Sequence, residues 1–383
     1  MGGRIKIKEA DIHITTECGS CCDYCYVDPH EQCPTATLFK EGPKEGDTYT
    51  LKRVISNLRR FAGVEDLVFV GGDPCAHGNL VKLMRHAKVE GLNVVVLSNT
   101  HQYFDGGEEV SIETVANFID EMDWTLHGPT TEKHNAFNKT PGSYQGVADR
   151  IKRFMAVRTS EQSVGIILNM VLSTIGSPEL LHDIMKNAIN ELGLVPEQDF
   201  FTIQRIAPSG KALLEWRKWM IDRQRLADAF GVFDQILAEF GIETKVCIDA
   251  IPWCALPEKY WHYLEPLKGG CNWGQPNGVL SVLMDGRLQR CALCKNDLGV
   301  NILNLHGPHD FTYFMEKNTT LCAIRERRHL ADTCLQCPLL EKCGGGCIIA
   351  NTDGVSVGDP YGEDPTNPRR GVDYLADPQA VIK

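Results

Sequence analysis

The sequence predicts an α/β fold in which helices cover a parallel sheet. Along residues 11–206, short apolar segments with strand character alternate with segments of helical periodicity. Strands that are joined by helical crossovers pair in parallel, because each crossover returns the chain in the same direction. Polar and glycine-rich turns follow several of these strands, and the last third of the chain is rich in cysteine. In parallel α/β folds, ligands bind where the strands end, so these turns are the expected binding site.

The individual elements follow from short-range patterns. Six strands are expected at residues 11–14, 67–70, 94–97, 124–126, 164–172 and 200–206. Helices with apolar residues at every third or fourth position are expected at residues 50–58, 80–87, 112–119 and 144–157. Thr50 is the expected N-cap of the first helix, and Ser177-Pro178 opens a further one. Residues 213–265 form a bridge with a helix that Gly241 ends.

Composition restricts the function classes. The chain has 383 residues and a formal net charge of −11, which disfavours a nucleic-acid backbone as the main partner. It has no signal peptide and no apolar run long enough to span a membrane. We therefore expect a cytoplasmic protein in which the sixteen cysteines are reduced thiols rather than disulfides.

The cysteines of residues 18–25 have the spacing of a metal site. Cys18, Cys22 and Cys25 form the pattern C-x3-C-x2-C. Three thiolates on one loop hold three irons of a [4Fe-4S] cluster and leave the fourth iron open to a reactant. Spacing alone also allows Cys21 in place of Cys22. A structural zinc loop is the alternative, although it usually needs four ligands.

This cysteine loop, with Tyr24 before its last member, resembles the signature of the radical S-adenosylmethionine (SAM) superfamily. The resemblance implies a partial (β/α)6 barrel and favours Cys22 over Cys21 as a ligand. It also implies that the open iron binds the amino and carboxylate groups of SAM. One electron then cleaves SAM and releases a 5′-deoxyadenosyl radical, which abstracts hydrogen from a substrate.

Three turns after predicted strands resemble the SAM-binding segments of this family. Residues 71–74 read Gly-Gly-Asp-Pro, close to the family's Gly-Gly-Glu-Pro, with the shorter acid Asp73 in place of Glu. Residues 98–100 follow the third strand, and residues 125–129 end the fourth. The resemblance implies the following SAM-binding residues: Tyr24, Gly71, Gly72, Asp73, Ser98, Asn99 and Thr125.

Two further segments are similar to parts of related enzymes but are less specific. His127, His134 and residues 141–144 match a family pattern with histidines and Pro-Gly-Ser. For both histidines, a purely structural role is an equal alternative. Residues 205–212 resemble the segment that closes such barrels, and a simple turn is the alternative there.

The C-terminal cysteines form a second, longer pattern. Residues 271–291 read C-x14-G-x4-C, and residues 334–347 read C-x2-C-x5-C-x3-C. This pattern resembles the SPASM domain, a small α+β module that binds auxiliary iron–sulfur clusters in radical SAM enzymes. Asp285-Gly286 between two apolar segments predicts a two-residue hairpin, which places Cys291 at the end of the returning strand. Zinc ribbons are the alternative for the cysteine pairs.

The resemblance implies two auxiliary ligand sets. The first consists of Cys254, Cys271, Cys291 and Cys347. The second consists of Cys334, Cys337 and Cys343, and its fourth cysteine normally lies downstream. Here Gly362 stands at that point and no cysteine follows Cys347. A carboxylate such as Asp359, an open iron, or loss of the cluster are the alternatives. Cys294 and Cys322 do not match the pattern, and Cys33, Cys75 and Cys247 are expected to be small apolar residues.

The expected organisation is a barrel in residues 1–212, a bridge in residues 213–265 and a SPASM domain with an acidic tail in residues 266–383. The expected function is hydrogen abstraction from a peptide or protein side chain, by an oxidoreductase that receives electrons from a flavodoxin or ferredoxin. Auxiliary clusters would accept an electron or bind the substrate. One alternative is a radical dehydrogenase or epimerase of a small molecule, and the lack of a leader-binding domain before the barrel would favour it. A second alternative is a non-enzymatic iron–sulfur carrier. The sequence identifies no catalytic base.

Overall fold

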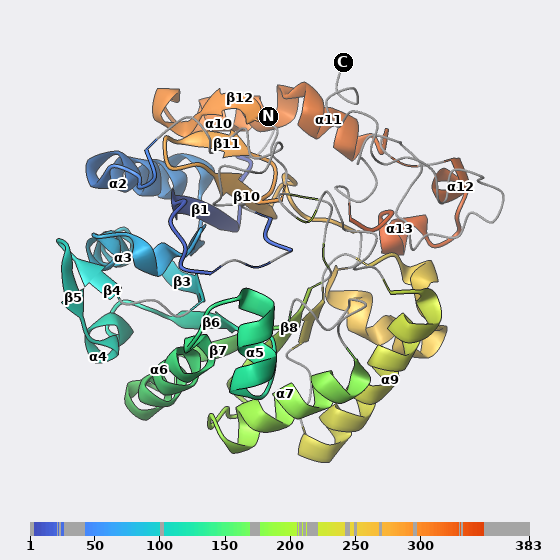
Figure 1. Ribbon diagram of the computed structural model, residues 1–383. Coiled ribbons are helices and arrows are strands. Elements are labelled where there is room, and N and C mark those ends of the chain that lie inside the picture. Colours follow the sequence, from blue (N-terminus) through green and yellow to red (C-terminus); the bar gives the residue numbers. More distant parts are fainter. Residues whose placement is uncertain are drawn as a thin grey trace.

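A curved ten-stranded sheet forms the centre of the molecule (Figure 1). The computed structural model describes residues 4–20, 22, 24–26, 43–99, 103–168, 177–204, 206, 209, 212, 221–241, 246–248, 251–267, 270–293, 297–328, 330 and 332–347. The strand order is β12-β11-β10-β1-β2-β3-β6-β7-β8-β9. All neighbouring strands from β10 to β9 are parallel, and only β10-β11 and β11-β12 are antiparallel.

The six strands expected from the sequence are adjacent in this order. They are β1 (Glu9–Thr15), β2 (Asp66–Gly71), β3 (Asn93–Ser98), β6 (Glu121–Thr125), β7 (Ser163–Ile167) and β8 (Phe200–Ile203). The last two end earlier than expected. Four more strands extend the sheet: β9 (Val246–Ile248), β10 (Val279–Val282), β11 (Arg287–Gln289) and β12 (Asp297–Asn301). A separate hairpin consists of β4 (Tyr103–Asp105) and β5 (Glu108–Val110).

Helices lie around the outside of the curved sheet (Figure 1). Those of the barrel are α2 (Thr48–Asn57), α3 (Leu80–Val89), α4 (Ile112–Ala116), α5 (Thr131–Asn138), α6 (Ser143–Val157), α7 (Pro178–Asn190) and α9 (Arg223–Phe240). The later ones are α10 (Pro308–Lys317), α11 (Thr319–Arg325), α12 (Asp332–Leu335) and α13 (Leu340–Cys343). Short 3-10 segments include Trp253–Ala255 and Glu258–Leu267. Within the described residues, no helix combines the length and apolar character needed to cross a bilayer.

Side-chain caps set the starts of two expected helices. The Ser177 hydroxyl accepts a hydrogen bond from the Leu180 N–H at 3.1 Å, as expected for an N-cap that precedes a proline. The expectation for α2 was wrong. Asp47 is its N-cap, and its carboxylate accepts from the Thr50 N–H at 2.8 Å. An aspartate is as good a cap as a threonine, so the helix begins one residue after it.

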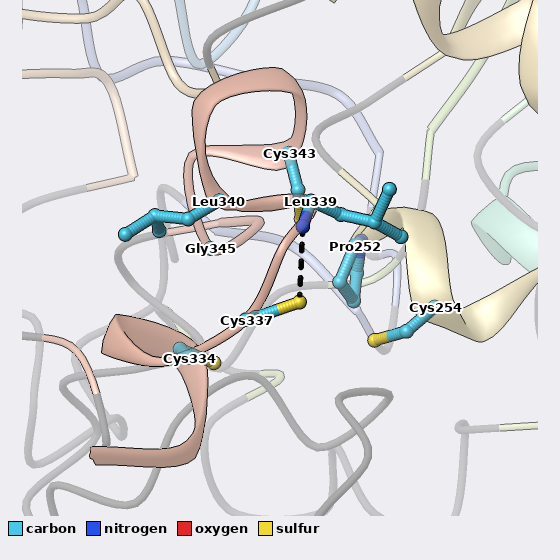
Figure 2. A pocket seen from close by; sticks show the side chains of 8 residues that line it. All are labelled: Pro252, Cys254, Cys334, Cys337, Leu339, Leu340, Cys343 and Gly345. Atoms are coloured by element: carbon cyan, nitrogen blue, oxygen red, sulfur yellow. Dashed lines mark hydrogen bonds between the residues drawn. The ribbon is translucent and has the colours of Figure 1, made fainter.

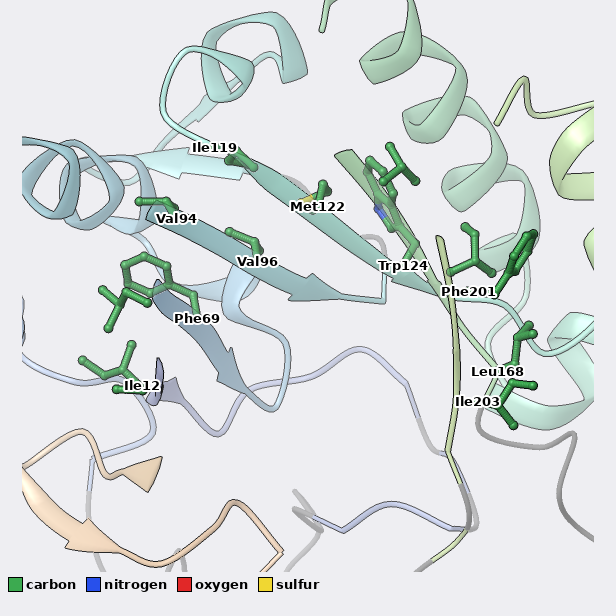
Figure 3. Close-up of a cluster of buried hydrophobic side chains, with 14 of the residues drawn as sticks. Ile12, Phe69, Val94, Val96, Ile119, Met122, Trp124, Leu168, Phe201 and Ile203 are labelled. Carbon is green, nitrogen blue, oxygen red and sulfur yellow. The ribbon is translucent and has the colours of Figure 1, made fainter. Parts of the chain in front are cut away.

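The two faces of the barrel sheet have different chemistry. Alternate residues such as Ile12, Phe69 and Trp124 are fully buried between the sheet and the helices (Figure 3). On β1 and β6, the intervening residues include Asp11, His13 and Asp123, which share the opposite, inner face because strand side chains alternate. The hydrophobic core thus lies outside the sheet, and the inside of the barrel carries buried polar residues together with apolar ones such as Val70.

The cysteine-rich region continues the barrel sheet through β10. This strand pairs in parallel with β1, and the register joins Glu9 to Val279 and Ile12 to Val282. The predicted hairpin forms, but its loop has three residues rather than the expected two. The Leu283 N–H donates to the Arg287 carbonyl at 2.9 Å, and Gly286, which has a φ of 89°, donates its N–H to the Leu283 carbonyl at 2.8 Å. The strand that carries the first cysteine loop therefore also contacts the hairpin that leads to Cys291.

Two carboxyl groups on β1, the half-buried Glu9 and the buried Asp11, make the stability of the fold depend on pH. Burial, followed by the charges of Asp66 and Glu121, raises the pKa of Glu9 from 4.5 to about 7. Burial and Glu9 likewise raise the pKa of Asp11. Between pH 4.5 and 7 the folded protein therefore holds a proton on Glu9 that the unfolded chain has lost. Stability contributed by this proton is complete at low pH and declines as the pH rises through this window.

We predict that Glu9→Gln stabilises the protein increasingly between pH 4.5 and about 7. The full effect is up to about 3 kcal/mol, because one pKa unit corresponds to about 1.4 kcal/mol. Denaturant unfolding of both proteins across pH 5–8 measures it. Burial lowers the pKa values of His13 and His134 to about 4, so their titration changes stability with pH in the opposite direction. Both proteins contain these histidines, and their contributions cancel when the two stabilities are subtracted. A stability difference that does not change with pH would contradict the prediction, and Glu65→Gln, at an exposed neighbouring site, is the control.

Candidate functional site

A cavity with a volume of about 710 Å³ lies where the strands of the barrel end. Its walls come from the loop after β1 and from the C-terminal ends of β2, β3, β6, β7 and β8. Nine residues that the sequence singled out line it: Cys18, Cys22, Tyr24, Cys25, Gly71, Gly72, Ser98, Asn99 and Thr125. The structure therefore brings together residues that are up to 107 positions apart in the sequence, from Cys18 to Thr125.

The three expected cluster ligands share one wall of this cavity. The loop folds back on itself, since the Cys25 N–H donates to the Cys22 carbonyl at 3.3 Å. The Ser20 N–H donates to the Cys18 sulfur at 3.4 Å, which suits a sulfur that carries negative charge. Burial raises the pKa of the Cys18 thiol to about 12, so this thiol loses its proton when a metal binds. Cys21 lies outside the described residues.

The Gly-Gly-Asp turn is attached directly to the cysteine loop. The Gly72 N–H donates to the Thr15 carbonyl at 2.8 Å, and the Asp73 N–H donates to the Glu17 carbonyl at 2.7 Å. A Cβ atom on Gly71 would overlap the Thr15 carbonyl oxygen, and one on Gly72 would overlap the Glu17 carbonyl oxygen. Glycine at both positions therefore lets the two backbones approach closely.

We predict that Gly72→Ala weakens SAM binding at least about tenfold, which corresponds to about 1.4 kcal/mol. The added methyl group displaces the Glu17 backbone, and with it the loop that carries Cys18. Equilibrium dialysis of labelled SAM against the anaerobically reconstituted protein measures the affinity. Gly307→Ala is the matched control, because a Cβ there meets no atom within 4 Å. Equal affinity of the Gly72 variant and the wild type would show that the turn does not position the loop.

Asp73 lies behind the cavity wall and holds two strand ends together. Its Oδ1 accepts from the Cys75 N–H at 3.0 Å and from the Ser98 hydroxyl at 3.1 Å. Its Oδ2 accepts from the Asn99 N–H at 2.9 Å. The carboxylate thereby joins the end of β2 to the end of β3 and positions Ser98 and Asn99, so Asp73 acts through its neighbours.

A chain of hydrogen bonds fixes Tyr24 in the cavity. The Tyr24 hydroxyl lies 2.7 Å from Nε2 of His127. The backbone N–H of His127 donates to Nδ1 of the His134 ring at 3.2 Å, and Nε2 of that ring lies 3.2 Å from the Ser143 hydroxyl. Burial lowers the pKa of both histidines, so both imidazoles are neutral near pH 7. This arrangement supports the structural alternative for His134, while His127 positions Tyr24.

The family profile described as "Radical SAM superfamily" matches residues 12–183. This span contains the three cysteines, the Gly-Gly-Asp turn and the strand ends that line the cavity. Residues 12–183 are a radical SAM domain. Such domains use a [4Fe-4S] cluster and SAM, and the cavity fits them: three thiols stand on one wall and hydroxyl and amide groups on others.

Curated relatives match different parts of this chain. The AdoMet-dependent heme synthase of Oleidesulfovibrio alaskensis is 26% identical over 132 residues, which are 34% of this chain and 31% of the relative. The chain thus spans about a third of the length of that relative. The PqqA peptide cyclase of Rhodopseudomonas palustris is 23% identical over 345 residues, which are 88% of this chain and 80% of the relative.

Solved structures show that the likeness of fold extends beyond the radical SAM domain. The structure of SuiB from Streptococcus suis bound to the precursor peptide SuiA has a TM-score of 0.65 and 14% identity, and covers 90% of this chain and 72% of SuiB. The structure of SuiB bound to S-adenosylmethionine has a TM-score of 0.64 at the same identity, and covers 90% of this chain and 73% of SuiB. The fold class expected for the whole chain, a partial barrel followed by a small α+β region, is confirmed.

Sequence reasoning missed six residues that line the radical SAM cavity. They are Ser20, Tyr26, Val70, Leu97, Ile167 and Gln204. Most of them stand at or next to a strand end, which is a signal that the sequence contained. Gln204 directly follows β8, but the predicted strand ran past it to residue 206 and hid this position. Most of the predicted closing segment 205–212 lies outside the described residues.

A second pocket, of about 360 Å³, lies beside α13 and contains four cysteines (Figure 2). Cys254, Cys334, Cys337 and Cys343 line it together with apolar residues such as Pro252 and Leu340. The family resemblance had assigned Cys254 to the other auxiliary set. In the structure, Cys254 lines the same pocket as the three cysteines of the second set.

Of the remaining auxiliary cysteines, Cys271 and Cys347 lie near each other, and none of the three lines this pocket. Burial raises the pKa of Cys271, the nearby Arg290 lowers it and the nearby Cys347 raises it. The Arg290 guanidinium lies 3.9 Å from the Cys271 sulfur. Cys291 is buried and lies just after β11. The pKa of Tyr26 in the radical SAM cavity is raised first by burial, then by the charge of Asp11, and also by the neighbouring thiols, which include Cys291. Asp359 and Gly362 lie outside the described residues.

No three His, Cys, Asp or Glu side chains among the described residues are close enough to hold a single metal ion.

Proposed function

We propose that this protein is a radical SAM maturase that modifies a side chain of a peptide or protein. The observation that carries the proposal is the cavity in which three cysteines face the glycine-rich turn and the polar strand ends. Support for a peptide substrate comes from the length of the similarity. Both the PqqA peptide cyclase and SuiB, which was solved with a precursor peptide, align with most of this chain.

The proposed role of each residue follows from its place in the cavity. When bound, the cluster and SAM supply a 5′-deoxyadenosyl radical. Cys18, Cys22 and Cys25 hold the cluster, while the backbone of Gly71 and Gly72 receives the amino group of SAM. The apolar side chains of Val70, Leu97 and Ile167 line the same cavity and exclude water, which would otherwise compete with hydrogen transfer from the substrate.

Polar groups at the strand ends orient the cofactor in this proposal. Ser98 and Asn99 are held by Asp73, and Thr125 stands at the end of β6. They are placed to donate hydrogen bonds to ribose or carboxylate oxygens. Tyr24 stands before the last ligand, and the neutral His127 fixes its hydroxyl. Because these groups are positioned before SAM binds, little conformational entropy is lost on binding.

We further propose that the cysteine-rich region in residues 266–383, with Cys254 from the bridge in residues 213–265, binds auxiliary clusters. They accept the electron left on the substrate after hydrogen abstraction, and an external flavodoxin or ferredoxin supplies electrons to the first cluster. The pairing of β10 with β1 supports this arrangement. β1 leads into the cysteine loop of the radical SAM cavity, and the β10-β11 hairpin leads to Cys291, so the two regions adjoin each other.

The test uses peptides encoded beside the gene. Each is synthesised with deuterium on its side chains and incubated anaerobically with the reconstituted protein, SAM and dithionite. We expect deuterium in the 5′-deoxyadenosine product and a mass change in the peptide. A cysteine-free scrambled peptide is the control. If only free amino acids or aminosugars transfer deuterium, the protein is the small-molecule dehydrogenase or epimerase and the peptide proposal fails.

A further inference from the structure

We infer that Cys254 is the fourth ligand of the auxiliary cluster held by Cys334, Cys337 and Cys343. This inference rests on the proposal that the cysteine-rich region binds clusters, and it concerns which residues hold which cluster. It moves Cys254 from the first ligand set to the second. The second set then needs no ligand from the tail, and the first set keeps three cysteines.

The geometry of the pocket beside α13 carries the inference. Cys334 and Cys343 belong to α12 and α13, and Cys337 lies between these helices, while Cys254 comes from the short helix Trp253–Ala255. Figure 2 shows the side chains of all four around one space, with the Cys254 sulfur directed toward those of Cys334 and Cys337. Four thiols that line one pocket match the ligand set of a [4Fe-4S] cluster.

Hydrogen bonds attach the Cys254 segment to the cysteine loop. The Trp253 N–H donates to the Cys343 sulfur at 3.4 Å, and the Leu339 N–H donates to the Cys337 sulfur at 3.4 Å. Backbone N–H groups directed at sulfur stabilise thiolates and tune iron–sulfur clusters. The Lys342 ammonium also lies 5.4 Å from the centre of the Trp253 ring. These contacts hold Cys254 at the pocket through its own neighbour in the sequence.

The apolar lining is consistent with a buried cluster. Pro252, Leu339 and Leu340 complete the wall of the pocket around the four cysteines. Such a shell limits the access of water and lowers the local polarity, both of which control the potential of a cluster. The acidic tail after residue 352, including Asp359, is then not required as a ligand.

The inference places the incomplete ligand shell at the other auxiliary set. Cys271, Cys291 and Cys347 supply three thiolates, which leave one iron of a cube without a cysteine. Cys291 follows the β10-β11 hairpin, and β10 pairs with β1, the strand that leads into the first cysteine loop. An open iron in this set is therefore on the side of the sheet where β1 and its loop lie, and that loop lines the radical SAM cavity.

The first experiment follows each cluster alone in the full-length protein. One background replaces the cysteines at 18, 22, 25, 271, 291 and 347 by alanine, and retains only the second set. A second background replaces those at 18, 22, 25, 334, 337 and 343, and retains only the first set. Cys254→Ser is then introduced into each, and iron, sulfide, zinc and the magnetic resonance spectrum of the reduced protein are measured after anaerobic reconstitution.

In the second-set background we expect about four irons per chain, a changed resonance spectrum on Cys254→Ser, and at least a twofold faster loss of iron to a chelator. In the first-set background we expect no change. Cys322→Ser is the matched control, because Cys322 is a partly exposed thiol of the same region outside both sets. An effect in the first-set background, or in neither, overturns the inference. Zinc instead of iron, or no metal in either background, overturns the proposed clusters, and the inference with them.

A second experiment does not require the heavily substituted backgrounds. A thiolate that is bound to iron is protected from alkylation, so labelling of Cys254 by iodoacetamide reports its ligand state. We expect at least tenfold faster labelling when Cys334, Cys337 and Cys343 are replaced by alanine, and an unchanged rate when Cys271, Cys291 and Cys347 are replaced. The reverse pattern, or equal labelling in all three proteins, overturns the inference.

Discussion

Replacing Cys22 by alanine is expected to reduce the formation of 5′-deoxyadenosine from SAM at least about a thousandfold, to background. Cys22 lines the cavity together with Cys18 and Cys25, and two thiolates do not retain a cube in the position that exposes one iron. Chromatography of anaerobic reactions with SAM and dithionite measures the product. The reaction does not require the substrate, so the result does not depend on its identity.

Cys21→Ala is the matched control for this prediction, because it removes a thiol from the same loop one residue away. We expect it to retain activity within about twofold. Abolished activity in the Cys21 variant, together with normal activity in the Cys22 variant, would show that the ligands follow the spacing C-x2-C-x3-C.

Removing Cys18, Cys22 and Cys25 together is expected to leave about two thirds of the iron, because in our proposal each of the two auxiliary sets holds a cluster equal in size to the first. Reductive cleavage of SAM is expected to be lost completely. The reason is spatial: the cysteines of the pocket beside α13 and the set around Cys271 do not line the radical SAM cavity. Iron and sulfide analysis and the absorbance of the reconstituted variant measure the outcome.

Cys322→Ala provides the comparison for a variant that loses a thiol without losing a ligand. Full retention of iron is expected there. Complete loss of iron from the triple variant, or zinc in its place, would contradict the proposal of auxiliary iron–sulfur clusters.

The barrel was predictable from the sequence because its signals are local. Apolar runs marked the six strands, and the turns after β2, β3 and β6 contained the glycine, serine and threonine residues that line the cavity. The Asp285-Gly286 turn predicted the β10-β11 hairpin for the same reason. The predicted ends of helices and strands were less accurate, because several neighbouring residues can serve as the cap. At the start of α2, both Asp47 and Thr50 are suitable N-caps, and Asp47 is the one used.

Contacts between distant segments were not predictable in the same way. The pairing of β10 with β1 depends on the register of strands about 270 residues apart. The hydrogen bond between Tyr24 and His127 and the convergence of Cys254 with Cys337 also join segments far apart in the sequence. A spacing pattern describes one loop at a time. Cys254 was therefore assigned to a ligand set by family resemblance, without information on its neighbours in space.

The most direct test of the central claim is whether SAM binds to the cluster of the radical SAM domain. In a full-length variant in which Cys254, Cys271, Cys291, Cys334, Cys337, Cys343 and Cys347 are replaced by alanine, only that cluster remains, and its reduced form is observed by magnetic resonance. Addition of SAM is predicted to shift this spectrum, and the shift is predicted to weaken when Gly72→Ala is added. An iron-loaded, reduced protein whose spectrum does not change with saturating SAM would contradict the account.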